Sequence, residues 1–230
     1  VLHFEGDKHS SLRMVRGVKN RFGAADEVGC FELREGGIHG VSDPSGLFLH
    51  HRADSVPGTA VTVTMDGKRA LLAEVQALVA PSHMPTPRRA VSGLDAARVS
   101  MILAVLERRC GVQLSSREVY AATIGGMRTT EPVVDLALAL AVASAAHDTA
   151  LPPGMVVLGE VGLAGEVRRV VGVDRRLAEA ARLGFTSAIV PSDQRRGVKD
   201  DTAGDPPGMR VVRVTDVAGA MQAAFERRRK

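Results

Sequence analysis

The chain is nearly free of aromatic side chains, and this shortage constrains its core more than any other feature. Aromatic residues make up 3% of the 230 positions, Trp is absent and Tyr120 is the single tyrosine, whereas hydrophobic residues reach 45%. A core of this composition is built from Ala, Val and Leu, which pack well on helices and in buried strands. The sequence therefore favours a mixed α/β fold over an aromatic-rich β-sandwich.

Two domains are expected, because the chain exceeds the roughly 100 to 200 residues of one average domain. Residues 55–58 (SVPG) form a plausible linker, which gives boundaries of 1–54 and 55–230. The first segment has short strand patterns at 1–5, 28–34 and 37–41, around a basic stretch at 12–21 suited to a strand or a short helix. A segment this small cannot build its own sheet core. We expect it to pack against a domain that precedes it.

The second segment alternates strand and helix patterns. Strand-like patterns occur at 59–65, where side-chain polarity alternates, and at 70–79. The Asp66-Gly67 turn between them predicts a β-hairpin. Helices are predicted at 92–109 with Gly111 as C-cap, from Pro132 to His147, at 174–183 and at 217–228. Strands are predicted at 155–159, 166–170, 187–190 and 210–214.

Charge and cysteine content exclude several classes of site. The 30 Lys+Arg and 26 Asp+Glu give a net charge of +4, a weak attraction to polyanions. Five of the 30 are lysines, so 25 are arginines, which suit bidentate phosphate contacts, although a GC-rich genome gives the same bias.

Cys30 and Cys110 lack the spacing of a zinc site or a disulfide framework. We therefore expect no metal or cofactor within the chain, and a reducing, cytoplasmic location. No apolar run is long enough to suggest a membrane span.

The first motif is Lys19-Asn20-Arg21-Phe22-Gly23. Two cations on a tight turn can grip a phosphate, and the simpler alternative is an exposed basic turn with Phe22 in the core. Together with 1–7, 13–23 and 27–33, this motif resembles the end of the RecA-like ATPase core in the RadA/Sms family of DNA-repair ATPases. The resemblance implies that Lys19 and Arg21 approach the nucleotide of a neighbouring subunit and sense ATP in trans.

The family's other cofactor sites do not occur in these 230 residues. No GxxxxGK[ST] loop is present, so the chain alone is not expected to hydrolyse ATP. The chain also begins at Val1 rather than Met, and we expect it to be the C-terminal part of a longer protein. The resemblance places ATP, Mg²⁺ and Zn²⁺ in the preceding part of such a protein.

Residues 59–228 resemble the peptidase domain of Lon proteases, most clearly at 72–80, 124–139 and 158–180. Lon peptidases use a Ser–Lys dyad, and here Val133 and Asp174 occupy the two positions. No lysine occurs between Lys68 and Lys199, and arginine cannot act as the base. His147 lies roughly 20 Å along the helix from Thr129 and Thr130, too far to activate either. The resemblance implies a Lon-protease-like α/β domain without peptidase chemistry.

A fold without catalysis can persist as a scaffold or a binding surface. By resemblance, we expect a homohexamer that contacts single-stranded and branched DNA without sequence preference, during processing and branch migration of recombination intermediates, with a RecA-type recombinase as a further partner. The alternatives are a pure oligomerisation module and an active Ser–Lys peptidase. The lack of Trp and the single Tyr120 argue against a base-stacking platform. The candidate DNA contacts are Arg88, Arg89, Arg98, Arg108, Arg109, Arg175 and Arg176.

Overall fold

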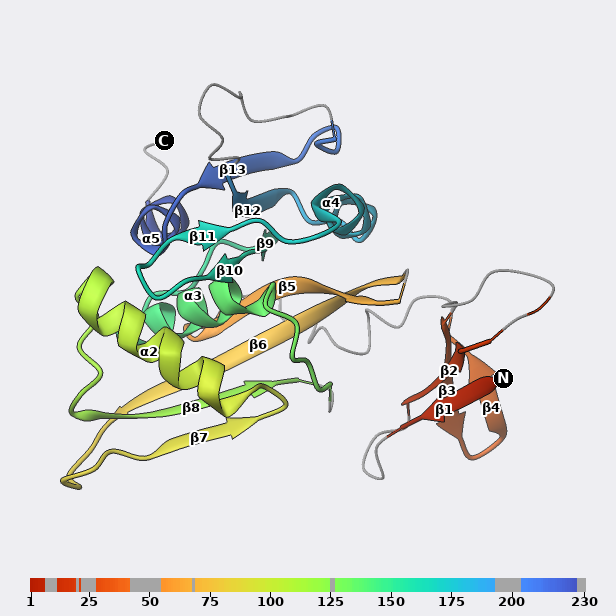
Figure 1. The fold of residues 1–230 in the computed structure, drawn as a ribbon, viewed down its shortest axis with the longest axis horizontal. Helices are drawn as coiled ribbons and strands as arrows, with labels where there is room; N and C mark the ends of the chain where they lie inside the picture. The colour runs from red at the N-terminus through yellow and green to blue at the C-terminus, as the bar shows by residue number, and fades with distance from the viewer. Residues whose placement is uncertain are drawn as a thin grey trace.

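The computed structural model describes residues 1–6, 12–19, 21, 28–41, 55–67, 69–124, 127–192 and 204–226. The described residues form a small four-stranded sheet and a larger α/β body built on a seven-stranded sheet (Figure 1). This arrangement confirms the predicted mixed α/β class. Among the described residues, no helix is long and apolar enough to span a bilayer.

The small sheet is antiparallel, in the order β1-β2-β3-β4. Its strands are Leu2–Glu5, Leu12–Gly17, Val28–Arg34 and Gly37–Gly40. The basic stretch from residue 12 is therefore a strand and not a helix. Of the described side chains in this sheet only Cys30 is buried, while Leu2, Phe4 and Ile38 are exposed. The described part of this segment thus has almost no core of its own, as its small size predicts.

The large sheet has the strand order β13-β12-β9-β5-β6-β8-β7. Its central hairpin, β5 and β6, is antiparallel, and β9, β12 and β13 run parallel to β5 on one side. On the other side β8 pairs antiparallel with β6, and β7 pairs parallel with β8. The strands are Thr59–Asp66, Arg69–Pro81, Arg89–Ser92, Arg117–Thr123, Met155–Val157, Ser187–Pro191 and Arg210–Val214.

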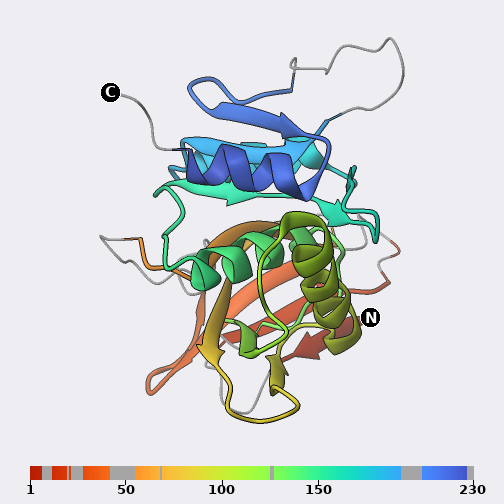
Figure 2. The same cartoon turned by 90° about the vertical axis from the view of Figure 1, so that its left-hand side faces the viewer.

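Helix α3 (Val134–Ala146) is the centre of the core, and eleven of its 13 residues are buried. It packs on β5 and β6, and helices α2 (Ala96–Cys110) and α5 (Val217–Phe225) pack against it. Helix α4 (Val173–Arg182) contacts β5 and β6, and Figure 2 shows it behind the sheet that α5 covers from the front. A two-stranded ribbon, β10 (Glu160–Val161) and β11 (Val167–Arg168), connects β9 to α4.

Several predicted boundaries need correction. The helix predicted from Ser92 begins at Ala96, because the Asp95 side chain accepts a hydrogen bond from the amide of Arg98 and caps it. Ser92 instead ends β7, a strand that the sequence did not predict, and β8 was missed as well. The predicted C-cap Gly111 is confirmed, with a left-handed φ of 70° and an amide bonded to the carbonyl of Leu106. The last helix ends at Phe225, and residues 227–230 lie outside the described part.

Candidate functional site

The KNRFG motif follows strand β2. Lys19 and Arg21 are both exposed, and the carbonyl of Lys19 accepts a hydrogen bond from the Val1 amino group at 2.6 Å. Asn20, Phe22 and Gly23 lie outside the described residues. The two cations are accessible, as a role towards a neighbouring subunit requires, and that role stays a prediction.

The two positions predicted to correspond to the Lon dyad lie at the starts of two helices. Val133 is 0% exposed and stands at the N-cap of α3, where its carbonyl accepts from the Gly159 amide at 3.1 Å. Asp174 is exposed in the first turn of α4. A buried valine offers no nucleophile, so a base at the second position would have no hydroxyl to deprotonate. Thr129 and Thr130 precede α3, whereas His147 follows its last residue. The helix therefore separates the histidine from both threonines, and they do not form a catalytic pair.

Arg176 was predicted as a DNA contact, and the structure corrects this prediction because the residue is only 1% exposed. Its guanidinium forms a bidentate ion pair with Glu131 and donates to the carbonyls of Val63 at 2.6 Å and Val171 at 3.0 Å. Glu131 also accepts from the Met65 amide at 2.9 Å. The pair therefore joins α4, strand β5 and the loop before α3. Four of the five N–H donors of Arg176 have partners inside the fold, and its burial keeps the guanidinium away from a phosphate in solution.

Helical periodicity contains the signal for this burial. Val173, Leu177 and Ala180 mark one face of α4 at spacings of four and three residues, and Arg176 lies on that face beside Leu177. Its neighbour Arg175 lies on the other face and is exposed. Residue type alone does not distinguish Arg175 from Arg176. Only their positions on the helix show that one is exposed and the other is buried.

Arg98 is also committed within the fold. Its guanidinium makes a bidentate contact to Asp135 in α3, with Nε to Oδ1 at 3.0 Å, and Glu160 lies 4.0 Å away. Asp135 is buried, and it accepts a further hydrogen bond from the Val161 amide at 3.2 Å. Arg98 remains partly exposed, but two carboxylates already neutralise its charge. We therefore expect it to orient α2 on α3 and not to dominate a DNA surface.

The stability of the fold should decrease with pH through the titration of Asp135. Burial raises the pKa of this carboxyl above its ordinary value of 3.8, and the bonds from Arg98 and Val161 offset only part of the effect. Just above pH 3.8 the folded chain therefore holds a proton that the unfolded chain has released, and this contribution to stability is lost as the pH rises through the raised pKa. We predict that Asp135→Asn flattens this slope, measured by urea unfolding between pH 4 and 7. An unchanged slope would contradict it.

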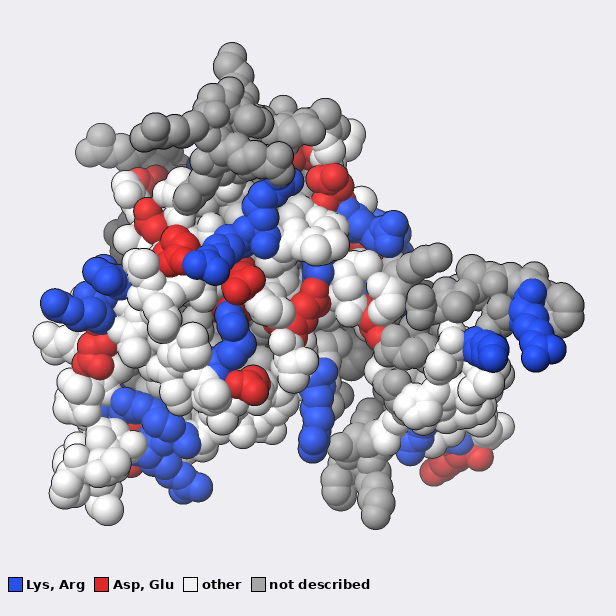
Figure 3. Space-filling model, viewed as in Figure 1, with Lys and Arg blue, Asp and Glu red and all other residues white. Residues whose placement is uncertain are grey.

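Four of the predicted arginines remain available. Arg88, Arg108, Arg109 and Arg175 are exposed, and within the described part of the chain they form no ion pair. Arg89 is exposed as well, but its guanidinium donates to the carbonyls of Leu114, at 2.8 Å, and Arg117. Figure 3 shows that basic side chains on the viewed face form separate groups and not one continuous patch.

The described residues contain no group of three or more His, Cys, Asp or Glu side chains suited to a metal ion. Burial raises the pKa of both thiols, Cys30 and Cys110, so each favours the protonated form. Within the described residues, the arrangement thus offers basic side chains on an α/β body, and no nucleophile is assembled at the predicted dyad positions.

Comparison with known proteins identifies the relatives of this chain. A family model described as subunit ChlI of Mg-chelatase matches residues 118–194, within the large α/β body. The chain is similar to DNA repair protein RadA from Mycolicibacterium smegmatis, at 60% identity over 98% of this chain and 47% of the relative. The RadA protein of Mycobacterium tuberculosis is 56% identical over 96% of this chain and 45% of that protein. The RadA protein of Streptococcus pyogenes serotype M1 is 45% identical over 98% of this chain and 49% of that protein. The chain thus spans about half the length of these relatives.

Proposed function

Because the chain belongs to the RadA family of DNA repair proteins, we propose that it is the portion of such a protein that holds subunits in a ring and contacts DNA. The proposed ring is a cytoplasmic homohexamer that binds single-stranded and branched DNA independently of sequence. It serves the processing of recombination intermediates, including branch migration. A RecA-type recombinase is the further partner.

The observation that carries the DNA contact is the set of exposed arginines without ion pairs. Arg88, Arg108, Arg109 and Arg175 keep free guanidinium groups, whereas Arg98, Arg176, Arg182 and Arg213 are paired with carboxylates. Side chains of the first kind can bind phosphates without losing an internal partner. Contacts of this type are independent of sequence and weaken as salt rises.

The body that presents these arginines is proposed to be a Lon-like domain without peptidase activity. Its support is the replacement of both dyad positions, by a buried Val133 and by Asp174. The neighbouring ion pair of Glu131 and Arg176 joins the same two helix starts. We propose that this pair stabilises a fold retained for assembly.

The role proposed for Lys19 and Arg21 lies across the subunit boundary of the ring. Both side chains are exposed, and guanidinium and ammonium groups in such positions stabilise the charge that develops on a transferred phosphoryl group. ATP with Mg²⁺, and Zn²⁺, belong in this proposal to the part of a RadA-type protein that precedes the matched region. The chain contributes only the sensing cations.

A double variant tests the DNA contact. Arg108→Ser with Arg109→Ser removes two exposed charges at the end of α2, and each lost phosphate contact should reduce the salt slope of single-strand binding by about 0.7. The measurement is fluorescence anisotropy with an oligonucleotide at several salt concentrations. Arg182→Ser is the matched control, because Arg182 is exposed but paired with Glu179 at 2.8 Å.

An unchanged slope in the double variant, or an equal loss in the control, would contradict the assignment of these two arginines. If the wild-type chain forms rings and binds no DNA at low salt, the alternative of a pure oligomerisation module replaces the proposal.

A further inference from the structure

The large sheet has an open face over β6, β8 and β7, and this face carries a hollow of about 370 Å³. Strand pairing places two rows of three side chains across it. Side chains alternate between the faces of a sheet, so both rows point to the same side. The rows are Leu78–Tyr120–Ala90 and Gln76–Ala122–Ser92.

The residue sizes explain the shape of the hollow. Tyr120 and Leu78 are large, whereas Ala90 and Ala122 are small and leave space beside them. Leu78 is 62% exposed, although its chain neighbour Ala77 is buried against the helices on the opposite face. An apolar side chain this exposed, next to an aromatic ring and a gap, is a surface suited to a flat apolar ligand.

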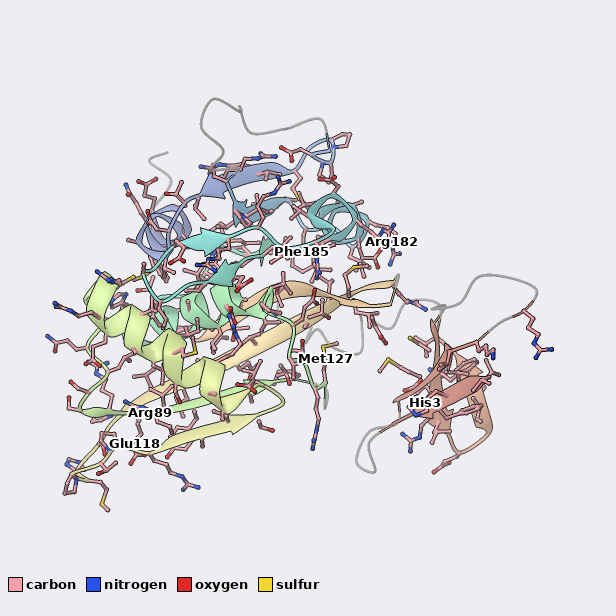
Figure 4. All side chains as sticks on the ribbon, in the orientation of Figure 1. His3, Arg89, Glu118, Met127, Arg182 and Phe185 are labelled. Atoms are coloured by element: carbon pink, nitrogen blue, oxygen red, sulfur yellow. The ribbon has the colours of Figure 1, made fainter. Side chains whose placement is uncertain are left out.

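Arg88, an exposed cation for which the described residues show no ion pair, lies at the rim of the hollow. The carbonyl of Arg88 accepts from the Val119 amide at 3.0 Å, which places Arg88 beside the residue before Tyr120. Arg89 comes next, but it pairs with the buried Val119, so its side chain points to the opposite face and its guanidinium donates to the carbonyl of Leu114. Figure 4 labels Arg89 and Glu118 at this end of the sheet. Glu118 is the acidic residue here, and it accepts a hydrogen bond from the Tyr120 hydroxyl at 2.7 Å. The Tyr120 ring is thereby held in place, and Arg88 remains free for an anion.

We propose that this hollow binds one nucleobase of single-stranded DNA, stacked on the Tyr120 ring against Leu78, while Arg88 holds an adjacent phosphate. The inference rests on the proposed function and adds a base contact to it. One tyrosine makes a site for one base and not a continuous platform. A base within a duplex is already stacked and paired, so the site favours single strands. The free guanidinium of Arg88 beside the Tyr120 ring favours a ligand that joins a flat ring to an anion, as a nucleotide does, over an apolar protein segment.

The test compares two oligonucleotides of equal length, one normal and one with abasic sugars throughout, which carry the same phosphates. We expect the chain to bind the normal strand about tenfold more tightly, since stacking on one aromatic side chain has about this value. Tyr120→Leu and Leu78→Thr should remove the difference without weakening abasic binding, while Tyr120→Phe should retain it. The fluorescence of a 2-aminopurine base in the strand should be quenched by the wild-type chain and not by Tyr120→Leu.

The outcomes separate the two proposals. If the chain binds both strands equally, the base site is wrong while the DNA contact stands, and the hollow belongs to a protein segment. An equal loss for both strands in Tyr120→Leu would also contradict the base site. Binding of neither strand would contradict the proposed function itself.

Discussion

Replacing Arg176 by methionine should lower the free energy of unfolding by about 3 to 5 kcal/mol, the usual cost of removing one partner from a buried ion pair. The apolar replacement fills part of the volume but leaves the Glu131 carboxylate without its counter-ion. It also leaves the Val63 carbonyl without the guanidinium that lies 2.6 Å away. Unfolding in urea, followed by circular dichroism, measures the effect.

The size of this effect follows from the edge of strand β5. This strand pairs with β9 only at Val61, so the edge groups beyond it need other partners. Arg176 satisfies the carbonyl of Val63, and Glu131 satisfies the amide of Met65. The ion pair thus completes the hydrogen bonding of an interrupted sheet edge.

Arg175→Met is the matched control, since Arg175 is adjacent in α4 but exposed, and surface changes of this kind usually stay within about 0.5 kcal/mol. Similar losses in both variants would contradict the structural role assigned to Arg176. The same result would reopen Arg176 as a surface residue.

Gly58→Ala should destabilise the fold by about 2 to 4 kcal/mol, from backbone strain and steric overlap together. Gly58 has a φ of +84°, and an added Cβ would lie 2.2 Å from the carbonyl oxygen of Ala77. The backbone cannot move away easily. The Gly58 amide donates to the Ser144 hydroxyl at 2.9 Å, and its carbonyl accepts from Ala77 at 2.7 Å.

Gly208→Ala separates the two contributions. Gly208 has a similar φ of +79°, but nothing lies within 4 Å of an added Cβ. This variant should show the strain alone, a loss of about 1 kcal/mol. If thermal unfolding gives equal losses for the two variants, the close approach of Gly58 to strand β6 is not present in solution.

Local signals predicted the parts of the fold that depend on near neighbours in the chain. The Asp66-Gly67 turn between two alternating runs identified the β5–β6 hairpin, and Gly111 identified the end of α2. These features follow from backbone conformation, which a few residues determine. The hairpin and the helix end could therefore be predicted from the residues that immediately surround them.

Strands β7 and β8 were missed because their stability comes from pairing. The strand Arg89–Ser92 has only four residues, and it forms because β8 binds it along one edge. Strand β8 in turn pairs with β6, at positions about 40 residues away in the sequence, such as Val79 with Val119. A sequence pattern cannot identify which distant strand supplies these hydrogen bonds.

The same limitation applies to the candidate site. An Arg-Arg pair indicated two surface cations, but tertiary packing buried Arg176 and left Arg175 exposed. The hollow could not be predicted at all, because Leu78, Tyr120 and Ala90 meet only after β6, β8 and β7 have paired. Tyr120 alone in the sequence gave no indication of an aromatic site.

A ring that grips DNA is tested most directly by the affinity of the wild-type chain for single-stranded DNA across a salt series, with its mass determined by light scattering in the same buffers. We predict a hexamer whose affinity falls steeply with salt, by a slope of about 0.7 for each phosphate contact, and does not change with base order. A hexamer without measurable DNA affinity at low salt would contradict it.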